Sequence, residues 1–145
     1  MESFAQAVVS LPAVELQRHI RIDNLADWCP AISGLVPHSG ERGSIVCQWG
    51  EECRVHREVI RHGLRFTLPG TEHALQWTLT TPVDRPGVVI VHCTADAAHE
   101  QADLAAEIEL FVRAWKEGIE AGANKLKADR AAKAAALPSC TPWFG

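Results

Sequence analysis

The residues best suited to chemistry are Arg57 and His92, which lie on predicted strands among apolar neighbours. Arg57 shares a strand face with two valines, and a buried guanidinium needs a carboxylate partner or an anionic or carbonyl ligand. The alternative is an edge or bent strand, on which Arg57 reaches water or pairs with Glu58 or Glu51. A histidine can move a proton to or from a bound carbonyl compound. Alternation alone does not orient His92, because both faces of its strand are almost equally apolar.

Aromatic side chains are the candidates for lining a hydrophobic binding site. Phe66 and Trp77 lie on the apolar faces of two strands with clear alternation, and both faces are expected to point inward. Simple core packing is the alternative, because Phe and Trp at strand or helix spacing usually pack against other residues. The predicted lining consists of Trp28, Trp49, Phe66, Trp77, Phe111 and Trp115.

The sequence lacks the common cofactor-binding and metal-binding patterns. It contains no Gly-rich phosphate loop, no HExxH pair and no GxSxG turn. His56 and Glu58 share a strand face, but two ligands without a third do not make a metal site. Five cysteines without a close pair predict structural thiols: Cys29, Cys47, Cys53, Cys93 and Cys140. We therefore expect neither a cofactor nor a metal.

Periodicity predicts an α+β fold in which all the strands precede one long helix. Residues 4–11 form the first predicted strand, and residues 12–21 and 25–29 form two short helices. Strands then follow with period-two alternation at 35–39, 44–49, 53–61, 64–69, 73–81 and 88–94. The connections between these strands are too short for crossover helices, so the sheet must be antiparallel.

The long helix is predicted over residues 97–136. Leu104, Ile108, Phe111, Trp115 and Ile119 recur at helical spacing, which predicts a helix lying across a curved sheet. The segment 127–136 is rich in alanine and charge, so it is expected to project from the body or pack on a partner. A proline-broken tail follows, and it is predicted either to fray or to dock through Trp143 and Phe144.

Three local patterns resemble the START-like (SRPBCC, helix-grip) superfamily, of polyketide-cyclase or Hsp90-activator-homologue type. Residues 8–14 (VVSLPAV) look like its strand-to-helix entry, residues 27–30 (DWCP) like its aromatic helix end, and residues 64–68 (LRFTL) like its fifth strand. The resemblance covers residues 4 to about 127. It implies a curved antiparallel sheet of about seven strands around a C-terminal helix, with two short helices after the first strand. It also directs His92 into the cavity.

The resemblance implies binding of a hydrophobic small molecule between the sheet and the long helix. Our first hypothesis is a cofactor-independent enzyme similar to polyketide cyclases, which promotes cyclisation or dehydration in natural-product metabolism. Arg57 would polarise a carbonyl group and His92 would move a proton. Tyrosine is absent, so a phenol general acid cannot operate. Two alternatives stay open: a non-catalytic carrier, or an interaction module like the Hsp90-activator relatives.

Length and charge limit the remaining possibilities. A chain of 145 residues predicts one domain, which we place at 1–127, followed by a helix extension and flexible tail at 128–145. A net charge of −4 makes nucleic acid an unexpected partner, and no apolar run approaches the roughly 20 residues of a membrane span. No secretory signal is visible at the amino terminus, so we expect a cytoplasmic protein. A homodimer stays open.

Overall fold

The computed structural model describes residues 1–47, 52–70, 74–96 and 102–136. Within these residues seven strands form one sheet: β1 (Glu2–Ala7), β2 (Ile32–Ser39), β3 (Arg42–Cys47), β4 (Glu52–Ile60), β5 (Gly63–Thr67), β6 (Gln76–Thr80) and β7 (Val89–Thr94). The helical elements are α1 (Ala13–His19), the 3-10 turn η1 (Ile22–Asn24), α2 (Leu25–Trp28) and α3 (Ala102–Ala136).

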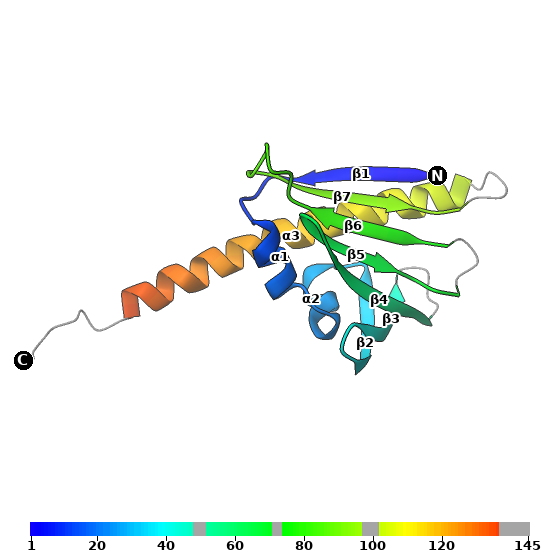
Figure 1. Ribbon diagram of the computed structural model, residues 1–145, viewed down its shortest axis with the longest axis horizontal. Coiled ribbons are helices and arrows are strands. Elements are labelled where there is room, and N and C mark those ends of the chain that lie inside the picture. Colours follow the sequence, from blue (N-terminus) through cyan, green and yellow to red (C-terminus); the bar gives the residue numbers. More distant parts are fainter. Residues whose placement is uncertain (48–51, 71–73, 97–101, 137–145) are drawn as a thin grey trace, which may run out of the picture.

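Every strand pair in the sheet is antiparallel, in the spatial order β1-β7-β6-β5-β4-β3-β2 (Figure 1). The antiparallel sheet and the two short helices after the first strand confirm the predicted helix-grip arrangement. Turn chemistry explains two of the reversals. Gly40, between β2 and β3, has φ +54°, and His62, between β4 and β5, has φ +70°. Both angles lie in the left-handed region that tight turns use.

The core lies between the concave face of the sheet and α3. Alternate residues of β5 and β6 are fully buried, as their sequence pattern predicts, and the apolar side of α3 covers them. Each such side chain contributes about 1.5–3 kcal/mol when it leaves water. The buried positions of α3 are Leu104, Ile108, Phe111, Val112, Trp115, Gly118 and Ile119.

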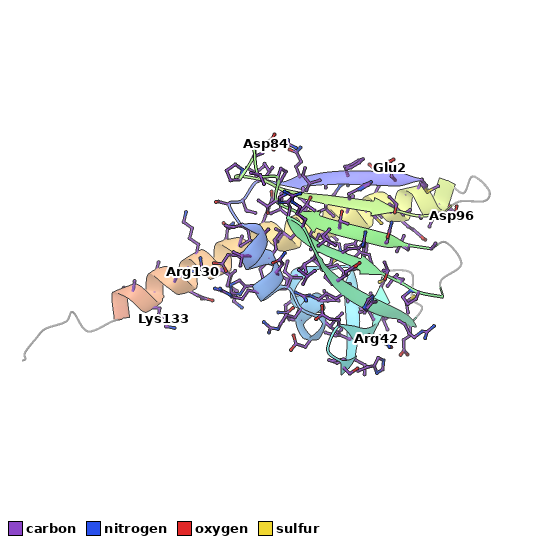
Figure 2. The ribbon with its side chains drawn as sticks, viewed as in Figure 1. Glu2, Arg42, Asp84, Asp96, Arg130 and Lys133 are labelled. Atoms are coloured by element: carbon purple, nitrogen blue, oxygen red, sulfur yellow. The ribbon has the colours of Figure 1, made fainter. Side chains whose placement is uncertain are left out.

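The C-terminal part of α3 extends past the sheet (Figure 1). Residues 127–135 are exposed, and Arg130 and Lys133 stand on this extension (Figure 2). Arg130 donates to Glu15 of α1 at 3.1 Å, which joins the extension to the body. The helix passes residue 127 without a break, and the tail with Trp143 and Phe144 lies outside the described residues. In the described part of the chain, no helix combines the length and apolar character needed to cross a bilayer.

Two glycines let α2 lie directly against α3. A Cβ on Gly118 would stand 1.8 Å from the backbone oxygen of Trp28, and one on Gly122 would stand 2.3 Å from the Trp28 ring. The indole ring and the backbone of Trp28 therefore occupy the space that side chains at positions 118 and 122 would need. Trp28 is only 7% exposed in this contact. The two glycines thus fix where α2 sits along α3.

We expect Gly118→Ala to lower the free energy of unfolding by about 2 kcal/mol, because the added methyl group collides with the Trp28 backbone. Urea unfolding followed by circular dichroism measures the loss. Gly87→Ala is the matched control, because a Cβ there meets nothing within 4 Å. A Gly118→Ala protein as stable as wild type would show that helix propensity outweighs the contact.

Glu120 of α3 holds the chain just after β1. Its carboxylate accepts the Val8 backbone N–H at 3.0 Å and the Lys116 ammonium at 3.0 Å. These hydrogen bonds, that of Val8 first, hold the pKa of Glu120 below its usual value. The charged carboxylate is therefore the form that stabilises the folded chain.

A lowered folded pKa contributes stability above the unfolded value of about 4.3, and this stability is lost as the pH falls through the folded value. We therefore expect Glu120→Gln to be less stable than wild type at pH 7 and equally stable near pH 3. Urea unfolding across this range measures the difference. Glu117→Gln, at a neighbouring exposed carboxylate, is the control. A constant difference at every pH would contradict the assignment.

Candidate functional site

Four aromatic rings meet between the sheet and α3. Phe66 of β5 stacks on Trp77 of β6 with centroids 5.3 Å apart and on Trp115 of α3 at 5.9 Å. Phe111 meets Trp77 edge-on at 4.9 Å, and the centroids of Trp77 and Trp115 are 6.0 Å apart. All four side chains are fully buried. We call Phe66, Trp77, Phe111 and Trp115 the ring cluster.

The sheet register produces the strand half of this cluster. Phe66 pairs with Trp77, and Trp77 pairs with Cys93, so the three side chains form one row on the concave face. Phe111 and Trp115 are four residues apart on α3 and therefore share a helix face. The structure thus brings together four of the six aromatic residues predicted to line a site.

The ring cluster contains two polar atoms without a hydrogen-bond partner among the described residues. These atoms are the indole nitrogens of Trp77 and Trp115, both buried from solvent. An indole N–H is a donor only, so each needs an acceptor oxygen, nitrogen or π face. Buried donors normally find such a partner, and an exception requires an explanation.

Three thiols are buried in the same core. Burial raises the pKa of Cys29 to about 12 and that of Cys93 to about 12, and it also raises the pKa of Cys47. These thiols stay protonated at neutral pH and behave as small hydrophobic side chains. In the part of the chain that the structure describes, no three metal-ligating side chains gather into a site.

Arg57 points to the concave side of the sheet, next to Phe66, and is 6% exposed. Its Nε donates to the Ile20 carbonyl at 2.9 Å, one terminal nitrogen donates to the Gln17 carbonyl at 2.6 Å, and the other contacts Glu41 at 2.6 Å. The carboxylate partner that an inward arginine requires is therefore Glu41, on the turn between β2 and β3. The guanidinium ties the end of α1 to β4, because two of its bonds reach carbonyls at that end.

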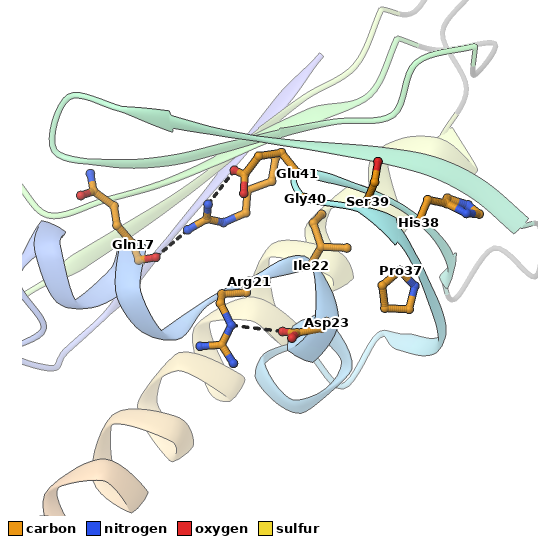
Figure 3. Close-up of a pocket in the computed structure, with 10 residues that line it drawn as sticks. Gln17, Arg21, Ile22, Asp23, Pro37, His38, Ser39, Gly40 and Glu41 are labelled. Carbon is orange, nitrogen blue, oxygen red and sulfur yellow. Dashed lines mark hydrogen bonds and ion pairs between the residues drawn. The ribbon is translucent and has the colours of Figure 1, made fainter.

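The head of Arg57 also lines a surface pocket of about 340 Å³ between η1 and the β2–β3 turn. Figure 3 shows Gln17 and Glu41 bonded to the guanidinium there, and Arg21 paired with Asp23 in the same pocket. Both cations of this pocket carry a carboxylate partner. Sequence reasoning missed Gln17 and Glu41, because no local pattern links them to a residue 16 to 40 positions away.

The inward orientation expected for His92 is wrong. Val89, Val91 and Cys93 are the buried residues of β7, so His92 lies on the outer face of the sheet. There its ring stacks on Phe4 with centroids 4.1 Å apart, and its Nε2 lies 2.9 Å from the Glu2 carboxylate. The deciding constraint is the register, because Cys93 pairs with the inward Trp77. The proton-transfer role suggested for His92 depended on the opposite orientation.

The other two predicted lining residues are Trp28 and Trp49. Trp28 packs against Gly118 and Gly122 of α3, beyond Trp115 along the helix. Trp49 falls outside the described residues.

Comparison with solved structures identifies the architecture. A START superfamily protein from Mycobacterium smegmatis superposes with a TM-score of 0.62 at 9% identity, over 87% of this chain and 97% of that one. The protein XoxI from Bacillus cereus gives a TM-score of 0.62 at 12% identity, again over 87% and 97%. The chain has a START-like fold.

Other matches agree with this START-like fold. A Thermobifida fusca protein gives a TM-score of 0.53 at 16% identity, over 88% of this chain and 94% of that one. No family model matches the sequence, and the search of curated proteins finds no significant match. Identities this low establish the START-like fold and leave function to the site itself.

We expect Arg57→Met to lower the free energy of unfolding by about 3 kcal/mol, because it removes the hydrogen-bond donor of Glu41 and of two backbone carbonyls. Urea unfolding provides the measurement. Arg65→Met is the matched control, because Arg65 pairs with Glu58 at 2.7 Å where both side chains are exposed, and such pairs contribute about 0–1 kcal/mol. Equal losses in the two variants would contradict the structural role of Arg57.

Proposed function

We propose that this chain binds a hydrophobic small molecule between the concave face of the sheet and α3. The observation that carries the proposal is the ring cluster, in which four aromatic side chains from two strands and α3 converge. Aromatic faces and edges offer large apolar contact areas for a planar or aliphatic guest. Ligand sites are mostly lined by such side chains, with a few polar groups that fix orientation.

The position of the ring cluster along the strands indicates the end of the sheet from which a small molecule would enter. Phe66 is the penultimate residue of β5, Trp77 is the second residue of β6, and Cys93 is the penultimate residue of β7. The row therefore lies at the end of the sheet where β5 leads to β6 and β7 leads to α3. A guest that enters from this end meets the rings after it displaces the adjacent buried side chains of Leu68, Leu75 and Ala95.

The polar residues support a non-catalytic carrier over a cyclase-like enzyme. Cyclisation or dehydration needs a group in the cavity that moves a proton or polarises a carbonyl. Arg57 would first have to release Glu41 or a helix carbonyl, and His92 lies on the opposite face of the sheet. Binding requires neither residue to change its partners.

The proposal predicts saturable binding of an apolar probe. We expect N-phenyl-1-naphthylamine to bind with one-to-one stoichiometry and a Kd in the micromolar range, which corresponds to about −8 kcal/mol. Probe fluorescence measures binding. Phe66→Leu should weaken it at least fivefold, because this substitution removes a ring that contacts both Trp77 and Trp115.

Phe4→Ala is the control for binding to exposed apolar surface, because Phe4 is 60% exposed on the outer face. This variant should bind the probe as wild type does. Circular dichroism checks that each variant is folded. Absence of saturable binding, or equal weakening in Phe4→Ala and Phe66→Leu, would disprove the proposed site.

A further inference from the structure

The indole N–H groups of Trp77 and Trp115, which have no hydrogen-bond partner among the described residues, indicate which polar group a bound hydrophobic molecule carries. Both nitrogens are buried, and neither has a hydrogen-bond partner among the described residues. Both side chains are fully buried, and their centroids are 6.0 Å apart. Two indole rings whose centroids are 6.0 Å apart place both N–H donors within the span of one small bound molecule.

Among the described residues, the neighbours of the two indoles in the sheet register and on α3 carry no side-chain oxygen. Across the sheet, Trp77 has Phe66 on one side and Cys93 on the other. The inward positions before and after Trp77 on its own chain segment are leucines. On α3, the buried residues near Trp115 are Phe111, Val112 and Ile119. The backbone carbonyls of the central strands are used by the sheet ladder, which leaves a neighbouring π face or a bound molecule as the source of the acceptor.

We infer that the hydrophobic guest carries a carbonyl oxygen that accepts hydrogen bonds from the indole N–H groups of Trp77 and Trp115. This inference rests on the proposed function and names the ligand class for the same site. A carbonyl oxygen has two lone pairs, so one oxygen can serve both donors. The apolar body of the guest then packs against the faces of Phe66 and Phe111.

Entry of the guest requires the rings to move apart, because neither nitrogen is open to solvent in this arrangement. Such an opening breaks no hydrogen bond at the indoles, since neither has one to lose. The carbonyl oxygen then supplies a partner that the closed cluster lacks. A hydrocarbon of the same shape would face the same opening without that gain.

A matched pair of probes isolates the carbonyl group. Fluorenone and fluorene have the same ring skeleton and differ in C=O against CH₂. Fluorene is the more hydrophobic, so burial alone favours it. We expect the wild-type protein to bind fluorenone at least tenfold more tightly than fluorene, as measured by tryptophan fluorescence quenching.

Trp77→Phe and Trp115→Phe each remove one donor while keeping an aromatic ring. Each variant should lose most of the preference for fluorenone and keep its affinity for fluorene, which serves as the internal control for folding and packing. In wild type, NMR should show the Nε1–H resonances of both residues shifting downfield with fluorenone and not with fluorene.

Equal affinity for fluorenone and fluorene would overturn the inference and leave the proposed function intact. It would assign the indole donors to neighbouring π faces, such as that of Phe111, which meets Trp77 edge-on. Nuclear Overhauser contacts between bound water and both indole protons in the fluorenone complex would also overturn it. Failure of fluorenone, fluorene and N-phenyl-1-naphthylamine to bind would reject the inference together with the proposed function.

Discussion

The close approach of α2 to α3 is the constraint on which the rest of the structure depends. Trp28 lies where side chains at positions 118 and 122 would otherwise stand, and only glycines leave that space. This contact holds α3 at a fixed height against the sheet. Phe111 and Trp115, on the preceding turns, then meet the rings of β5 and β6. The same contact holds α2, and through it the chain that leads back to α1.

Arg57 links α1 to the sheet. Its stem lies beside Phe66 on the concave face, while its head bonds carbonyls at the end of α1 and the carboxylate of Glu41. A buried cation is tolerated because its partners are a carboxylate and two carbonyl oxygens, all of which carry full or partial negative charge. The polar interactions thus sit at the margin of the core, and the ring cluster stays apolar apart from two indole N–H groups.

The antiparallel direction of the strands, the short helices and the long helix could all be predicted from periodicity and turn residues, because these are local properties. The inward faces of β5 and β6 were equally clear, since one set on each strand is apolar and the other polar. The site was harder to predict. Phe66, Trp77, Phe111 and Trp115 do gather, whereas His92 faces outward and Trp28 packs between helices. The family resemblance suggested the wrong face for His92. Both alternating sets of residues on β7 are apolar, so only its pairing with β6 determines which set points inward.

The sequence by itself determined which segments become strands and helices, because alternation, helical spacing and turn chemistry act over a few residues. It also determined the inward face wherever the two faces differ in polarity. Only the tertiary structure decided the orientation of β7, because the pairing of Cys93 with Trp77 is a contact between strands. It alone decided the partners of Arg57, which lie 16 to 40 positions away along the chain. Such contacts depend on how whole elements pack, and no local pattern encodes them.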